Sequence, residues 1–89
     1  NIETAAQCLK VLSHPVRLRI LCALRGGEQT VQNLEYYTGI RQTTLSQHLS
    51  LLKSRGLLVS RREATYSFYR ISNENIIELF DLIKEIYCT

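Results

Sequence analysis

This chain of 89 residues lacks the short motifs by which many enzymes are identified. It has no glycine-rich phosphate loop, no serine nucleophile elbow, no pair of carboxylates in a defined frame and no Cys-x-x-Cys. No apolar run approaches the length of a membrane span, and no signal peptide is visible. We therefore expect a protein that is not an enzyme, binds no cofactor and has no membrane partner. The sequence leaves open whether an N-terminal segment precedes Asn1.

Cysteine is scarce. The three residues Cys8, Cys22 and Cys88 are an odd number and are widely spaced. This is not the disulfide framework of a small secreted domain, and together with the missing signal peptide it favours the reducing cytoplasm. A free cysteine is most often a small buried hydrophobe, and Cys8 is assigned to that role.

The net charge of +3 is small, but the charged residues are unevenly placed. Six basic residues and a single acid, Glu63, lie between Arg41 and Arg70, whereas acidic residues gather toward the two ends. A basic centre is typical of a module that contacts phosphate. The apolar content of 45% predicts a packed core in a single domain over residues 1–89.

The spacing of apolar residues predicts five helices and one β-hairpin. Ser13 is expected to cap the second helix, Thr30 the third, and Gly39 to end the third. Ser72 is expected to start the last helix. The expected helices are Thr4–Leu12, His14–Arg25, Val31–Thr38, Gln42–Arg55 and Asn73–Tyr87, and the expected strands are Leu57–Arg62 and Tyr66–Ile71.

The stretch from Thr30 to Arg70 thus contains two helices joined by a turn, followed by a basic hairpin. This order predicts a fold that is mainly α with a small β-hairpin wing, a winged helix-turn-helix with the order α-α-α-α-β-β-α. In the helix from Gln42, the residues Leu45, Leu49 and Leu52 form the inward stripe.

The opposite face of that helix has only short hydrogen-bonding side chains, which suit the major groove of DNA. His48 lies near the edge of the stripe, where a packed or a phosphate-contacting role are both open. Two arginines near the hairpin tip favour phosphate contacts over a solvated edge. The candidate DNA-binding residues are Gln42, Thr43, Thr44, Ser46, Gln47, His48 and Ser50 on the helix and Arg61, Arg62 and Thr65 on the hairpin.

Two other features concern partners. The last helix has apolar residues over far more than one stripe, which predicts a homodimer packed through that helix. A winged helix that docks on proteins instead of DNA is the alternative reading. Such a surface would be expected to have Leu, Phe or Trp anchors on the face of Gln42–Arg55, where the sequence has Thr, Gln and Ser.

Three segments in this order resemble the ArsR/SmtB family of winged-helix repressors: LSHPVRLRILCAL at 12–24, TTLSQHLSLLKSRGLL at 43–58 and SFYRIS at 67–72. The resemblance covers essentially the whole chain. It implies a transcriptional repressor that dimerises through its first and last helices. It also implies binding to an imperfect inverted repeat in double-stranded DNA and release by an inducer.

The inducers of this family include metals, but the matching ligands are absent. The segment TVQNLEYY has no Cys-x-Cys, and NENIIELFDLIKEIYCT has no histidine, so no metal site is expected. Cys22 and Cys88 match the two thiols of the subgroup that senses persulfides and oxidants. The resemblance implies that a disulfide or polysulfide bridge between them weakens DNA binding. Haem or a small ligand as inducer remains the alternative.

Overall fold

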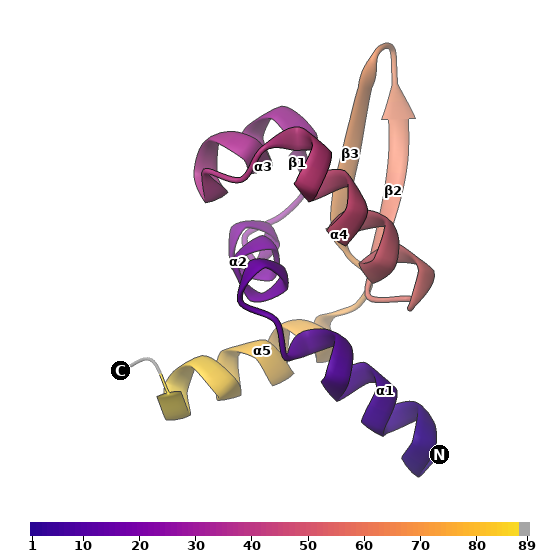
Figure 1. The fold of residues 1–89 in the computed structure, drawn as a ribbon, viewed down its shortest axis with the longest axis vertical. Helices are drawn as coiled ribbons and strands as arrows, with labels where there is room; N and C mark the ends of the chain where they lie inside the picture. Colours follow the sequence, from indigo (N-terminus) through magenta and orange to yellow (C-terminus); the bar gives the residue numbers. More distant parts are fainter. Residues whose placement is uncertain (88–89) are drawn as a thin grey trace.

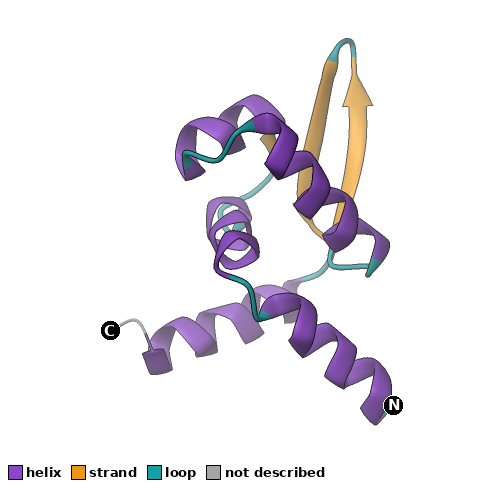
Figure 2. Ribbon diagram, viewed as in Figure 1, coloured by secondary structure: helices purple, strands orange, loops and turns teal. Residues whose placement is uncertain are grey.

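The computed structural model describes residues 1–87 and contains, within them, five helices and a three-stranded antiparallel sheet (Figures 1 and 2). The prediction of a mainly α fold with a wing is confirmed. Cys88, one of the two predicted switch residues, lies outside the described residues. The elements are α1 (Ile2–Leu12), α2 (Pro15–Leu24), β1 (Gln29–Thr30), α3 (Val31–Thr38), α4 (Gln42–Ser54), β2 (Leu58–Glu63), β3 (Tyr66–Ile71) and α5 (Glu74–Tyr87).

The strand β1 was not expected from the sequence. It pairs antiparallel with β3, with Gln29 opposite Tyr69 and Thr30 opposite Phe68, and the sheet order is β1-β3-β2. A strand of two residues is too short to show an alternating pattern. Thr30 is also the N-cap of α3, where its Oγ1 accepts a hydrogen bond from the Asn33 N–H at 3.1 Å.

The hydrophobic core lies where α2, α3 and α4 pack together and against the base of the wing. The inward stripe of α4 is confirmed, because Leu45, Leu49 and Leu52 are fully buried. Leu21 of α2 is fully buried as well. The other buried apolar residues are Val11, Leu12, Ile20, Leu24, Leu34, Leu57, Leu58, Ile71 and Phe80.

The helix caps differ from expectation at two places. The prediction that Ser13 caps α2 is wrong, because the His14 Nδ1 accepts the Val16 N–H at 3.1 Å. Ser13 instead donates its hydroxyl to the carbonyl of Lys10, at the end of α1. Pro15 follows in the first helical position, where its missing N–H is harmless.

The last helix begins one residue later than expected, at Glu74. The Asn73 Oδ1 accepts the Ile76 N–H at 3.2 Å, whereas the Ser72 hydroxyl donates to the carbonyl of Gly56 at 2.7 Å. Ser72 therefore ties the end of the wing to the end of α4 and leaves the capping to Asn73. The third helix ends as expected, because Gly39 has a left-handed φ of 71°.

Helices α1 and α5 lie at the end of the molecule opposite the wing tip (Figure 1). Both leave large apolar side chains exposed: Ile2 and Leu9 on α1, and Leu79, Leu82, Ile86 and Tyr87 on α5. None of the described helices combines the length and apolar character required to cross a membrane. The exposed apolar residues are therefore concentrated on one end layer of the fold.

Candidate nucleic-acid interface

The exposed face of α4 is formed by short polar side chains. Because Leu45, Leu49 and Leu52 hold one side of the helix in the core, its other side must face solvent. No acidic or large apolar residue interrupts this face within the described helix. Six of the predicted DNA-binding residues are exposed there: Gln42, Thr43, Thr44, Ser46, Gln47 and Ser50.

The start of α4 is held by a residue that the sequence pattern did not reveal. Arg41 occupies the N-cap position but makes no capping hydrogen bond with its side chain. The Glu35 Oε2 of α3 accepts the Gln42 N–H instead, at 3.0 Å. A carboxylate at this position satisfies a free backbone donor and is favoured by the helix dipole. The two helices of the motif are thereby joined at the end of α4 that lies next to its polar face.

The hairpin places the two predicted arginines on opposite faces. Directly paired residues of β2 and β3 share a face and neighbours alternate, so Arg62 lies with Ser60 and Ser67, and Arg61 with Phe68. The face of Ser60 is the one next to α4, because the Lys53 Nζ donates to the Ser60 Oγ at 2.7 Å. Arg62 therefore shares a side of the wing with α4.

Arg61 is engaged on the other face. Its guanidinium donates to both carboxylate oxygens of Glu28, at 2.8 and 2.9 Å, and to the Glu63 Oε2 at 2.5 Å. The guanidinium carbon also lies 4.3 Å from the centroid of the Phe68 ring. These carboxylates raise the pKa of Arg61, and Arg61 lowers the pKa of Glu28. Arg61 thus joins the wing to the segment before β1 and has its charge balanced by two acids.

The wing ends in a two-residue turn formed by Ala64 and Thr65, and Thr65 is exposed at the tip. Ala64 has a φ of 54°, in the left-handed region, where a side chain with a Cβ costs roughly 1–2 kcal/mol. Ala64→Gly should therefore raise the free energy of unfolding by about 0.5–1 kcal/mol, the greater freedom of glycine in the unfolded chain offsetting part of the gain.

Urea denaturation at equal protein concentration measures this difference. Thr65→Gly is the matched control, because Thr65 has no positive φ and glycine there should give no gain. An Ala64→Gly protein that unfolds at lower urea than the wild type would contradict the assignment of strain to this turn.

His48 is turned inward, away from the polar face of α4. It is half-buried, and its ring centroid lies 4.8 Å from that of His14. The Arg17 Nε donates to the His48 Nδ1 at 3.3 Å. Burial, followed by the effects of His14 and Arg17, lowers the pKa of His48. Of the two roles that the sequence left open, the packed one fits this position.

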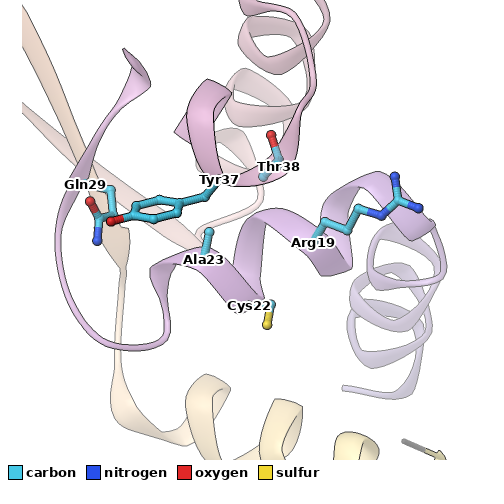
Figure 3. Close-up of a pocket in the computed structure, with 6 residues that line it drawn as sticks. All are labelled: Arg19, Cys22, Ala23, Gln29, Tyr37 and Thr38. Atoms are coloured by element: carbon cyan, nitrogen blue, oxygen red, sulfur yellow. The ribbon is translucent and has the colours of Figure 1, made fainter. Parts of the chain in front are cut away.

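Cys22 is exposed on the side of α2 that faces α5. Figure 3 shows its sulfur pointing toward α5 and away from Tyr37, while Arg19 extends away from Tyr37 and Gln29. Cys22 borders a cavity of about 210 Å³ whose other walls are Leu18, Arg19, Phe80, Ile83 and Lys84. The side of α2 that carries Leu18 and Cys22 thus faces α5 across this cavity.

A larger hollow lies on the other side of Cys22, between α2, α3 and β1 (Figure 3). It has a volume of about 480 Å³ and is lined by Arg19, Cys22, Ala23, Gln29, Tyr37 and Thr38. The Thr38 hydroxyl is already bound to the carbonyl of Leu34 at 2.6 Å. The Arg19 guanidinium extends away from Tyr37 and Gln29, so the polar groups of this hollow do not converge on one point.

Helix α2 is tied to α5 by an ion pair at its end. The Arg25 guanidinium donates to both carboxylate oxygens of Asp81, at 2.6 and 2.7 Å. The pair lowers the pKa of Asp81 and raises that of Arg25. Within residues 1–87, no group of three His, Cys, Asp or Glu side chains is placed to hold a metal ion.

Comparison with known proteins shows which family this chain resembles in sequence. A protein-family model described as "Bacterial regulatory protein, arsR family" matches residues 14–60. The Biofilm growth-associated repressor of Xylella fastidiosa is 43% identical over 84 residues, which cover 94% of this chain and 74% of that protein.

Solved structures extend the similarity to the whole fold. The transcriptional repressor BigR from Xylella fastidiosa has a TM-score of 0.92 at 40% identity, covering 99% of this chain and 90% of that structure. The homodimeric winged helix-turn-helix DNA-binding domain from Mycobacterium bovis, solved in solution, has a TM-score of 0.87 at 39% identity, covering 96% and 79%. The likeness thus includes α4, the wing and the layer of α1 and α5.

Proposed function

Because this chain belongs to the arsR family of bacterial regulatory proteins, we propose that it represses transcription as a homodimer bound to an imperfect inverted repeat in double-stranded DNA. Its relatives are named transcriptional regulators, so it is a DNA-binding regulator and not an enzyme. We further propose that joining Cys22 to Cys88 releases it from DNA. A cytoplasmic location follows from DNA as partner.

The observation that carries the DNA-binding proposal is the polar face of α4. A helix face of Thr, Gln and Ser offers donors and acceptors without bulk, which is what base edges in the major groove require. We propose Gln42, Thr43 and Gln47 as base contacts. The shorter residues Thr44, Ser46 and Ser50 would then contact bases or phosphates at the edges of the groove.

The wing supports phosphate contacts by one of its two arginines. Arg62 lies on the same side as α4, and Thr65 is exposed at the tip. We propose both as phosphate contacts. Arg61 is already held by Glu28 and Glu63, so in this proposal it fixes the position of the wing while Arg62 binds.

The exposed apolar side chains of α1 and α5 support the homodimer. Leu82 and Ile86 are 57% and 65% exposed in the single chain, and Ile2 on α1 is 83% exposed. A twofold contact through this layer would cover them and would place two copies of α4 in adjacent major grooves. An inverted repeat is the DNA sequence that matches this symmetry.

The position of Cys22 supports release by oxidation. Its sulfur points toward α5, and Cys88 follows directly after α5. A disulfide needs Cα atoms within about 7 Å, and inserted sulfur atoms relax that limit. In forming the disulfide the two thiols lose two electrons and two protons to an oxidant of the peroxide class. A bridge between α2 and α5 would then change the dimer layer and with it the spacing of the two α4 helices.

The DNA-binding proposal is tested by two substitutions with different expected signatures. Gln47→Ala should relax base preference by about 1–3 kcal/mol at one position of the site, because a bidentate base contact is lost. Arg62→Ala should weaken binding to all sequences about equally, because a phosphate carries no sequence information. Binding to a duplex selected with the reduced wild-type protein, and to single-base variants of it, measures both.

Ser54→Ala is the matched control, since Ser54 lies at the far end of α4 and its hydroxyl is bound to the carbonyl of Leu51 at 2.7 Å. It should bind like the wild type. Unchanged affinity and base preference in both Gln47→Ala and Arg62→Ala would show that α4 and the wing do not form the interface.

A further inference from the structure

One side chain joins the end of α1 to α4. Arg17, on α2, donates its Nη1–H to the carbonyl oxygen of Val11 at 2.9 Å and its Nε–H to the His48 Nδ1 at 3.3 Å. Among the described residues, no other side chain forms hydrogen bonds to both α1 and α4. Arg17 and His48 are both half-buried, so these bonds are partly shielded from water.

The bond between Arg17 and His48 requires a neutral imidazole. The His48 Nδ1 accepts from Arg17, so this nitrogen must have no proton. The His14 ring packs against the His48 ring, and the His14 Nδ1 is itself an acceptor for the Val16 N–H. Protonation of His48 would remove its lone pair at Nδ1 and would place an imidazolium beside the guanidinium of Arg17.

Two other charged groups close to α4 are engaged elsewhere. Glu35, on α3, bonds to the Gln42 N–H at the start of α4. Lys53, on α4 itself, bonds to Ser60 on β2. His14 and Arg17 are the titratable or charged groups that act on His48, and no carboxylate of the described residues forms an ion pair with it. A positive His48 would therefore have no acidic partner.

We infer that Arg17 and His48 are positioning residues that hold α4 at a fixed place relative to α1, and that protonation of His48 releases this hold and weakens operator binding. The inference rests on the proposed role of α4 in reading DNA and of α1 in the dimer layer. If α1 sets where the two subunits meet, the hydrogen bonds from Val11 through Arg17 to His48 fix the position of α4 relative to that interface.

The sign of the effect follows from the direction of the pKa shift. The folded pKa of His48 lies below its ordinary value of about 6.5. The contribution of the Arg17–His48 hydrogen bond to operator affinity is therefore present in full above about pH 6.5. It is lost as the pH falls from there through the folded pKa. A histidine that contacted phosphate would behave oppositely, because its positive charge would tighten DNA binding on acidification. The direction of the pH dependence thus distinguishes positioning from phosphate contact.

The test measures operator affinity of the reduced dimer at pH 7.5 and at a pH below the titration midpoint of the His48 imidazole, at constant ionic strength. Wild-type affinity should fall about three- to tenfold on acidification, the effect of one hydrogen bond. His48→Asn keeps an acceptor near the position of Nδ1 and cannot titrate, so its affinity should change less than about twofold. Arg17→Lys keeps the charge but has a single nitrogen, which cannot take the places of both Nε and Nη1. It should bind more weakly at pH 7.5 and show a flatter pH dependence.

Arg19→Lys is the matched control, because it makes the same change at an exposed position of the same helix and should behave like the wild type. An NMR titration of the wild-type imidazole needs no variant: the midpoint should lie below the ordinary histidine value, with Nδ1 unprotonated at pH 7.5. A midpoint above it would overturn the inference. So would tighter wild-type binding at the lower pH, or a His48→Asn protein that retains the full acid response. Absence of operator binding at both pH values would overturn the proposed function itself.

Discussion

Cys22→Ser is expected to remain bound to the operator under an oxidant that releases the wild type. The Cys22 sulfur points toward α5 and borders the cavity between α2 and α5, so it is the thiol from which a bridge to the residue after Tyr87 can start. Without this thiol no disulfide or polysulfide bridge from Cys22 can form. The wild type should lose affinity about 5- to 150-fold on oxidation, the usual range of coupling between two sites, and Cys22→Ser less than about twofold.

The measurement is operator affinity before and after treatment with a thiol oxidant or glutathione persulfide, with mass spectrometry of the products. Cys88→Ser should behave like Cys22→Ser. Cys8→Ser is the control that should respond like the wild type, because Cys8 packs against the core from α1. A Cys22→Ser protein that is still released on treatment would contradict this mechanism. A wild-type protein that is not released would leave another inducer, such as haem or a small ligand.

Leu82→Asp is expected to convert the dimer to a monomer and to lower operator affinity by about two to four orders of magnitude. Leu82 is 57% exposed on α5, so in a single chain the substitution disturbs little of the core. In a twofold interface through α5 the same carboxylate would be buried without a partner, at a cost of several kcal/mol. A monomer then reaches only one half-site and loses the gain from binding both at once.

Sedimentation of the reduced protein over a range of concentrations measures the oligomeric state. Tyr36→Asp provides the matched control, because Tyr36 is 83% exposed on α3 and its replacement should leave the dimer intact. Circular dichroism of the Leu82→Asp protein separates loss of the dimer from loss of the fold. A Leu82→Asp protein that sediments as a dimer would show that α5 does not form the interface.

The parts of the fold that depend on local sequence could be predicted. The stripe of Leu45, Leu49 and Leu52 repeats every three to four residues and is therefore visible without any knowledge of what it packs against. The Thr30 cap and the Gly39 turn depend on one or two neighbouring residues. The two-residue strand β1 left no pattern of its own, and its pairing with β3 joins residues about forty positions apart.

The roles of single side chains at the site were harder to predict for the same reason. Arg61 and Arg62 are neighbours in sequence, but Arg61 finds Glu28, which is 33 residues away. His48 lies at the edge of the α4 stripe, and its partner Arg17 is 31 residues away. The sequence shows which residue types are available for contact with DNA. It does not show contacts between residues far apart in the chain, and these contacts determine which side chains are already engaged.

The link between the wing and the body of the domain has a consequence for the thermodynamics of association. A two-stranded ribbon alone is marginally stable in water, whereas this ribbon has β1 along one edge and Arg61 clamped by Glu28 at its outer face. The wing should thus meet the double helix already ordered, so that little backbone conformational entropy is lost on contact. The free energy gained from each phosphate contact then contributes almost fully to the affinity. The rate of association is limited by orientation of the dimer rather than by folding of its wing.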